Sequence, residues 1–221
     1  MIEKRKIRAL LLFLAACAVF VCFACLVRLC WVAPIGPKGS EVGFAELNGA
    51  VRDAIGTNGF CKKASDLLGD LSLGIVCLFG AFGFVQLLQR KNLLKVDHDI
   101  LILGVTYLVT LGCYVLFEVF PVNFRPVLED GALAASFPSS HTVLFLVVLL
   151  TAAMQARKRI EKKPLRVALI TVCLVLAGIG VVLRLLSGIH WITDIVGGFL
   201  LTGVLIDLYL TAGVLFDVEV R

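Results

Sequence analysis

Two of the three histidines in this 221-residue chain stand where an imidazole could do chemistry. His190 is followed four residues later by Asp194, so the two side chains share one face if the segment is helical. A carboxylate in that position can hold an imidazole in one tautomer and raise its basicity. His141 stands directly before an apolar run, in the stretch "FPSSHTVLFL". A titratable group at such a boundary is costly unless it has partners or a function.

The residues around these histidines favour phosphoryl transfer. Arg125 and Arg184 are permanent cations with a planar fork that suits phosphate oxygens. Ser139 and Ser140 precede a predicted helix, whose first backbone N–H groups are unpaired and can bind an anion. Such a set can supply a nucleophile, a general acid and charge stabilisation, and it requires no metal or other cofactor. Histidine–metal chemistry is the alternative, but the remaining histidine, His98, falls on the opposite side of the predicted topology.

The elements that must position these residues are membrane-spanning helices. The chain is 60% hydrophobic and 17% charged, which is typical of integral membrane proteins. An apolar stretch of about 18 residues can cross the hydrocarbon core of a bilayer. Six candidate stretches predict an all-α, six-helix membrane bundle that forms a single domain over residues 1–221. Their approximate bounds are Ala9–Val32, Leu71–Gln89, Ile100–Phe120, His141–Gln155, Val167–Leu186 and Ile189–Phe216.

The basic residues predict how this bundle is oriented. Clusters of Lys and Arg precede the first span and lie between the second and third spans and between the fourth and fifth. All three clusters belong to one side, which the positive-inside rule makes cytoplasmic, together with both termini. The net charge of +5 therefore reflects topology, and we expect no nucleic-acid partner. On the outer side, Phe44, Leu47, Val51 and Ile55 have helical spacing, which predicts an amphipathic helix at the membrane surface between spans one and two.

Three polar clusters fall at the outer ends of spans three to six, so one fold can bring them to a single depth. They are "FEVFPVNFRP", which contains Glu118 and Arg125, "PSSH", which ends at His141, and "RLLSGIHWITD", which runs from Arg184 to Asp194. Ionisable residues at this depth are candidates for a functional site. Glu129, which lies between the first two clusters, is expected to be a solvated loop charge.

The order and spacing of these clusters resemble the type 2 phosphatidic acid phosphatase family of membrane phosphatases. That family has three motifs, K-x6-R-P, P-S-G-H and S-R-x5-H-x3-D. Arg125-Pro126 matches the end of the first motif, and "PSSH" matches the second with Ser140 in place of Gly. "RLLSGIHWITD" matches the third motif, except that Leu183 stands where the motif has Ser. The motif core covers residues 118–194, and the joint occurrence of the motifs is far more specific than any one of them.

The resemblance implies a role for each matched residue. His190 would attack phosphorus and form a phosphohistidine, and Asp194 would orient it. His141 would protonate the leaving lipid alcohol and then activate water. The phosphoryl oxygens would be held by Arg125, Arg184, Ser139 and the backbone N–H groups of Ser140 and His141.

Glu118 departs from the family pattern, because it stands seven residues before Arg125, where the family has a phosphate-binding lysine. A carboxylate about 4 Å from a phosphoryl charge would cost on the order of 4 kcal/mol per unit charge at an effective dielectric of about 20. Three explanations remain open. Glu118 pairs with Arg125 and orients it, or it accepts a cationic headgroup or assists transfer to an alcohol, or the site binds lipid without catalysis.

Three functions follow from these alternatives. The leading one is a membrane lipid phosphatase that acts on a phosphomonoester or pyrophosphate at the extracytoplasmic face. The second is a headgroup phosphotransferase on the same fold, and the third is a non-catalytic lipid-binding membrane protein. We expect lipid phosphates or prenyl pyrophosphates as substrates, membrane lipids as partners, and a bacterial cytoplasmic membrane as the location.

Overall fold

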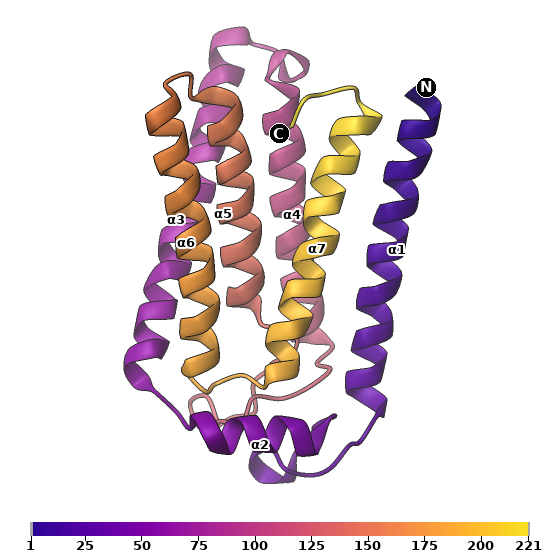
Figure 1. The fold of residues 1–221 in the computed structure, drawn as a ribbon, viewed down its shortest axis with the longest axis vertical. Coiled ribbons are helices and arrows are strands. Elements are labelled where there is room, and N and C mark those ends of the chain that lie inside the picture. Colours follow the sequence, from indigo (N-terminus) through magenta and orange to yellow (C-terminus); the bar gives the residue numbers. More distant parts are fainter. Residues whose placement is uncertain (1, 221) are drawn as a thin grey trace.

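The structure, a computed structural model, describes residues 2–220 and is built from helices. Six long helices stand side by side, and the short helix α2 lies across one end of them, while both termini lie near the other end (Figure 1). The helices are α1 (Ile2–Leu29), α2 (Ala45–Ile55), α3 (Gly59–Arg90), α4 (His98–Val119), α5 (Ser140–Arg159), α6 (Lys163–Leu186) and α7 (Ile192–Leu215), with the 3₁₀ turns η1 (Pro37–Gly39) and η2 (Leu93–Lys95). The predicted domain also included Met1 and Arg221, which lie outside the described residues.

The six long helices confirm the predicted all-α, six-span bundle, since each is long and apolar enough to cross a membrane. The largest difference lies in α3, which begins at Gly59 rather than at Leu71. Asn58 starts this helix early, because its side chain accepts a hydrogen bond from the backbone N–H of Cys61 (3.0 Å). The additional N-terminal turns of α3 carry polar residues that we had expected in the connection before the second span.

Helix α2 corresponds to the predicted amphipathic helix between the first two spans. Its buried Asn48 donates hydrogen bonds to the backbone oxygen of Gly43 (2.7 Å) and to Oγ1 of Thr193 at the start of α7 (3.0 Å). The backbone N–H of Asn58 donates to the oxygen of Ser187 (3.2 Å), in the turn between α6 and α7. The connection between α1 and α3, which includes α2, therefore contacts both ends of the turn that carries His190.

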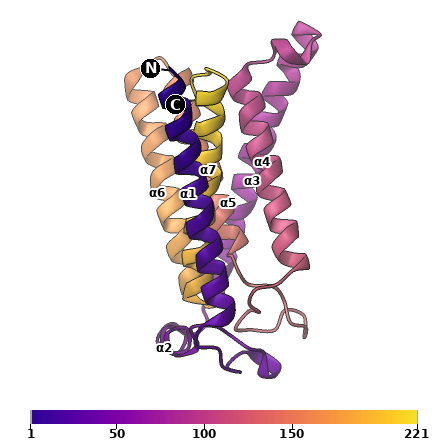
Figure 2. The ribbon, with the colours of Figure 1, turned by 90° about the vertical axis from the view of Figure 1, so that its right-hand side faces the viewer.

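Helix α5 is the central element of the bundle. It packs against α3, α6 and α7, and it buries Phe145 and Leu149 almost completely. Before α5, the ring of Phe137 lies beside the rings of Phe20 and Phe117, and its centroid is 6.2 Å from the centroid of each. Helices α3 and α4 form a pair that leans away from the other long helices near the end where the termini lie (Figure 2).

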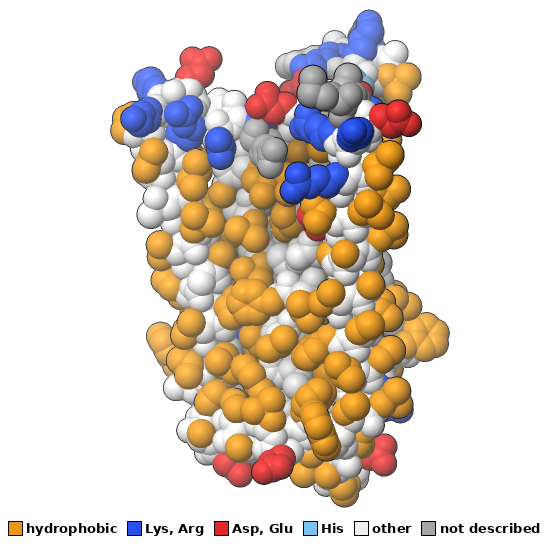
Figure 3. All heavy atoms as spheres, turned by 45° about the vertical axis from the view of Figure 1, so that its right-hand side comes forward, with side chains coloured by type: hydrophobic (Ala, Val, Ile, Leu, Met, Phe, Trp, Pro, Cys, Tyr) orange, Lys and Arg blue, Asp and Glu red, His pale blue; other side chains and the backbone are white. Residues whose placement is uncertain are grey.

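Basic side chains gather at the end of the molecule where the termini lie, and an apolar belt covers the sides of the long helices (Figure 3). At that end, Arg90 and Arg159 pair with Asp97 in the connection between α3 and α4 (2.8 and 3.1 Å). Burial acts to raise the pKa of Asp97, but hydrogen bonds from Arg90, Gln86 and Arg159 outweigh it and lower this pKa to about 2. These contacts hold the α3–α4 connection against the end of α5.

Candidate active site

His190 lies in the turn between α6 and α7, where a carboxylate and a hydroxyl hold one edge of its ring. The fully buried Asp194 has its Oδ2 3.6 Å from Nδ1 of His190. Ser136 lies beside both, because its Oγ is 3.2 Å from Nδ1 and also donates a hydrogen bond to Oδ2 of Asp194. The same Oδ2 accepts a hydrogen bond from the backbone N–H of Trp191 (2.8 Å), which caps α7. The expected His190–Asp194 pair is present, and Ser136 bridges it.

The other edge of the His190 ring faces Arg184 of α6. Nη2 of Arg184 lies 3.1 Å from Nε2 of His190, and only 1% of the Arg184 side chain is exposed. Nη1 donates to Oδ1 of Asp66 (3.0 Å), whereas Nε has no hydrogen-bond partner among residues 2–220. Burial, followed by the charges of Arg184 and Arg125, holds the pKa of His190 well below its usual range. His190 is therefore neutral near pH 7, as a nucleophilic imidazole must be.

His141 lies in the first turn of α5, and Ser139 sets where that helix begins. Oγ of Ser139 accepts hydrogen bonds from Oγ1 (3.0 Å) and from the backbone N–H (3.4 Å) of Thr142. The hydroxyl of Ser139 is fully buried and acts as an acceptor in this cap, and its expected role in holding phosphoryl oxygens stays a prediction. Ser140 and His141 line a groove beside the site, and backbone N–H groups in the first turn of a helix have no intrahelical acceptor.

Arg125 reaches the site from the connection between α4 and α5. Its Nε donates to the backbone oxygen of Ala135 (3.1 Å), and its Nη1 pairs with Glu129 (2.9 Å). Glu129, which we expected to be a solvated loop charge, is thus the carboxylate that orients Arg125. The explanation in which Glu118 pairs with Arg125 is not supported, since Glu118 forms no ion pair with any described residue. Glu118 and Arg125 instead both line the groove.

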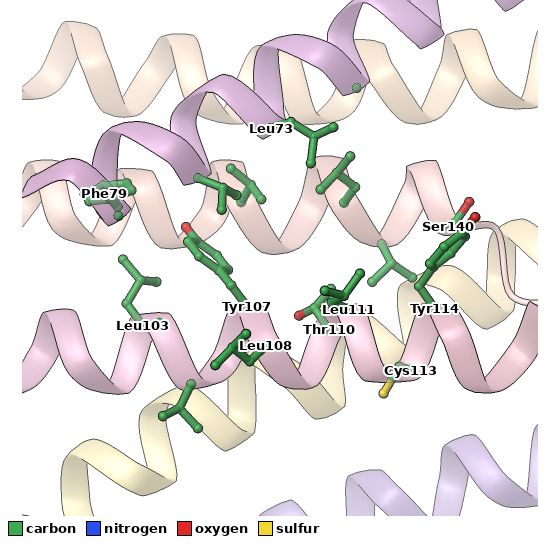
Figure 4. Close-up of a pocket in the computed structure, with 18 of the residues that line it drawn as sticks. Leu73, Phe79, Leu103, Tyr107, Leu108, Thr110, Leu111, Cys113, Tyr114 and Ser140 are labelled. Atoms are coloured by element: carbon green, nitrogen blue, oxygen red, sulfur yellow. The ribbon is translucent and has the colours of Figure 1, made fainter. Parts of the chain in front are cut away.

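The groove has a volume of about 1040 Å³ and runs between α3, α4 and α5 (Figure 4). His141, His190 and Arg125 line one end of it, and Val96 and Ile100 line the other. Side chains along its middle are mostly apolar and include Leu73, Phe79, Leu103, Leu108 and Leu111. A polar site that continues into an apolar groove along most of α4 suits an amphiphile with a charged head and a long chain.

Three residues that contact the site carried no recognised signal in the sequence. Ser136 bridges the His190–Asp194 pair, Asp66 contacts Arg184, and Lys62 pairs with Asp66 (2.8 Å). Lys62 and Asp66 are four residues apart, which is the spacing of a helical ion pair and the one signal that could have indicated them. We had assigned this stretch to the outer connection, so the spacing was not linked to the site.

The sequence profile of the PAP2 superfamily matches residues 99–214, which is more than half of the chain. The chain belongs to the PAP2 superfamily. The matched region runs from the first turn of α4 to the end of α7, so it includes every residue to which the motif resemblance gave a role. The resemblance to the type 2 phosphatidic acid phosphatases is thus confirmed at the level of the family.

A solved structure shows the same PAP2 fold. The crystal structure of a transmembrane PAP2-type phosphatidylglycerolphosphate phosphatase from Bacillus subtilis is similar to this chain with a TM-score of 0.58 and 21% sequence identity. The similarity covers 93% of this chain and 96% of that chain. No curated protein sequence gives a significant match. The chain is a six-span integral membrane protein and a membrane lipid phosphatase of the PAP2 superfamily.

Proposed function

We propose that this protein hydrolyses a phosphomonoester or pyrophosphate of a lipid at the extracytoplasmic face of the membrane, through a phosphohistidine and without a metal ion. One observation carries the proposal. Nδ1 of His190 lies against Ser136 and Asp194, while Nε2 lies 3.1 Å from the guanidinium of Arg184. A histidine held at one ring nitrogen presents the other to a phosphoryl group that the arginine binds.

In the first step, a phosphoryl oxygen takes over the hydrogen bond that Nη2 of Arg184 gives to Nε2 of His190, which frees the Nε2 lone pair. Nε2 of neutral His190 then attacks the phosphorus, and the bond from phosphorus to the leaving oxygen breaks. Positive charge develops on the His190 ring, where Asp194 stabilises it through Nδ1. His141, as an imidazolium, gives its proton to the leaving oxygen. The lipid departs as an alcohol from a monoester or as a monophosphate from a pyrophosphate, and His141 is left neutral.

In the second step, neutral His141 takes a proton from water while the water oxygen bonds to phosphorus and the phosphorus–nitrogen bond breaks. Inorganic phosphate leaves, His190 is again neutral and His141 again carries its proton. Throughout both steps, Arg125, Arg184 and the backbone N–H groups at the start of α5 balance the charge of the phosphoryl oxygens. Apart from the attacking water, this chemistry uses only groups that the chain itself provides.

The apolar part of the groove supports a lipid as the substrate. Its lining runs from His141 at one end of α5 to Val96 near the opposite end of the bundle, so a long chain can lie along α4 while its phosphate remains at the site. The basic clusters and both termini are at the opposite end of the bundle from the turn between α6 and α7, which carries His190. By the positive-inside rule that end is cytoplasmic, so the phosphate would be cleaved at the outer face.

The test is release of inorganic phosphate by detergent-purified protein, with a chelator present, from a panel of lipid monophosphates and prenyl pyrophosphates. We expect release by the wild type and none by His190→Ala. His98→Ala is the matched control, because His98 is exposed at the opposite end of α4 and should be dispensable. Release that persists in His190→Ala, or that stops when the chelator is added, would contradict the proposal.

Glu118 favours headgroup transfer as the second candidate function. Its carboxylate lines the groove with Arg125 and forms no ion pair with a described residue, so it is free to meet a cationic headgroup or an acceptor alcohol. A phospholipid diester donor and a soluble alcohol should then yield a new lipid by mass spectrometry, and Glu118→Gln should yield less. Phosphate release without any transfer product favours hydrolysis. Neither product, with lipid still bound, would favour the non-catalytic alternative.

A further inference from the structure

The N-terminal turns of α3 pack against the imidazole of His141. Three residues of these turns have helical spacing and so share one face of α3, namely Lys62, Asp66 and Gly69. We infer that Asp66 is a positioning residue whose carboxylate holds His141 against α3, in place to protonate the leaving group. This inference rests on the proposed phosphatase function, and it adds to that site a carboxylate from a helix that the motif core does not include.

Asp66 uses its two oxygens for different partners. Oδ2 accepts a hydrogen bond from Nζ of Lys62 (2.8 Å). Oδ1 accepts one from Nη1 of Arg184 (3.0 Å) and lies 3.6 Å from Nε2 of His141. Two cations therefore hold the carboxylate in place, and it cannot turn away from the imidazole without loss of an ion pair.

Gly69 leaves the space in which the His141 ring lies. A Cβ atom at Gly69 would be 2.9 Å from Cδ2 and 3.1 Å from Nε2 of His141, which is too close for an undisturbed ring. The buried ring of Phe145 contacts His141 edge-on, with centroids 5.9 Å apart. The imidazole is thus confined between the backbone of α3 and an aromatic ring of its own helix.

The site consequently contains two carboxylate–imidazole pairs, and Arg184 connects them. Asp194 faces His190, Asp66 faces His141, and the guanidinium of Arg184 contacts His190 with one nitrogen and Asp66 with the other. The two pairs have different roles. Asp194 supports attack on phosphorus for every ester, whereas Asp66 supports the proton transfer that His141 performs. Asp66 also accepts a hydrogen bond from Arg184, and in Asp66→Asn an amide oxygen can still accept it, so this variant tests the charge beside His141.

That proton transfer has a specific chemical requirement. When the bond from phosphorus to oxygen breaks, its electron pair stays on the oxygen, which takes the proton from the His141 imidazolium and leaves a neutral ring beside Asp66. An alkoxide needs this proton in order to leave, but a nitrophenolate is stable as an anion and does not. Loss of Asp66 should therefore lower the rate for an ester with an alkoxide leaving group more than the rate for an ester with a nitrophenolate leaving group.

The experiment compares kcat/KM for dioctanoyl phosphatidic acid and for p-nitrophenyl phosphate, since this constant includes only the steps up to departure of the leaving group. Asp66→Asn should lower kcat/KM for the alkyl ester by about 10- to 100-fold, a part of the roughly 10²- to 10⁴-fold that general acid catalysis contributes. The same variant should change kcat/KM for the aryl ester by less than about 3-fold. Gly69→Ala, which pushes the ring rather than removing its partner, should show the same selective loss.

Asp53→Asn is the matched control, because Asp53 is an exposed carboxylate on α2. Comparison of the wild type with His190→Ala tests the proposed phosphatase function. Comparison of the two esters in Asp66→Asn tests the role of Asp66, so the two proposals can fail separately. Equal losses on both esters in Asp66→Asn, or no loss on either, would overturn the inference. If Asp66→Asn does not elute from size-exclusion chromatography as folded protein, Gly69→Ala is judged instead by whether its loss is confined to the alkyl ester. If the wild type is inactive on both esters, the inference is overturned together with the proposed phosphatase function on which it rests.

Discussion

The guanidinium of Arg184 spans two functional groups, with Nη2 3.1 Å from Nε2 of His190 and Nη1 3.0 Å from Oδ1 of Asp66. Both terminal nitrogens are engaged at the same time, and the separation of two such donors matches two oxygens of a phosphoryl group. Because only 1% of the Arg184 side chain is exposed, these contacts are formed away from bulk solvent. The planar fork of Arg184, and not its charge alone, therefore organises the site.

Arg184→Lys should lower kcat/KM for a lipid phosphate by about 10- to 100-fold, because one ammonium cannot replace both charge-assisted contacts. Arg8→Lys makes the same exchange at an exposed position at the far end of α1 and should have no effect. Steady-state kinetics of both variants in detergent provide the measurement. Wild-type kinetics for Arg184→Lys would show that charge alone suffices at this position.

His190 should remain neutral in mildly acidic solution. Burial, Arg184 and Arg125 place its pKa well below the usual value of about 6.5, so protonation, and with it loss of the nucleophile, begins only as the pH falls through that lower pKa. The ¹⁵N signals of the His190 ring, assigned by their absence in His190→Ala, should show the neutral form at pH 6. A titration midpoint at or above 6.5 would mean that the ring is not held in this environment.

Ser136→Ala should lower kcat with little change in KM. The hydroxyl of Ser136 contacts both Nδ1 of His190 and the carboxylate of Asp194, so its loss loosens the nucleophile without removing a phosphate ligand. Loss of one such hydrogen bond corresponds to a fall of about 3- to 10-fold in kcat. Ser40→Ala is the control, because the buried Oγ of Ser40 has no hydrogen-bond partner among residues 2–220. A rise in KM at constant kcat would instead make Ser136 a substrate ligand.

Glu118→Lys should improve the use of simple lipid phosphates, since it replaces a negative charge on the groove wall by a positive one. The expected result is a several-fold lower KM. This is less than the full effect of a contact at 4 Å, which is on the order of 4 kcal/mol per unit charge. Glu161→Lys makes the same charge reversal at an exposed position between α5 and α6. Unchanged kinetics in Glu118→Lys would show that this charge does not shape the substrate.

Asp97→Asn should destabilise the protein, because Asp97 joins Arg90 to Arg159. We expect a Tm lower by about 2 to 8 °C at pH 7, from the loss of about 1 to 2 kcal/mol. The pKa of Asp97 is lowered to about 2 in the folded protein. Its contribution is therefore complete above the unfolded value of about 3.9 and is lost as the pH falls through 2. The Tm difference between wild type and variant should be equal at pH 7 and pH 5 and smaller at pH 3.

Much of this architecture follows from local properties of the chain. The length of each apolar stretch sets a helix that can cross a bilayer. The spacing of His190 and Asp194 indicated that they meet, although His190 lies in the turn before α7 and only Asp194 lies in that helix. "PSSH" combines capping residues with the beginning of an apolar run, which is why the start of α5 could be predicted. Such features depend on residues a few positions apart, so no knowledge of the packing is needed to find them.

Contacts between distant segments could be decided only by the tertiary structure. Asp66 and Arg184 lie in different helices, as do Asn48 and Thr193, and no spacing in the sequence indicates that they meet. From the sequence we considered only Glu118 as a partner of Arg125 and expected Glu129 to be a solvated loop charge, but the fold of the α4–α5 connection places Glu129 against Arg125. By itself the sequence determined the family, the spans and the two histidines. The packing of α3 against α5 and α6 decided which carboxylate faces His141, since that choice depends on how whole helices fit together.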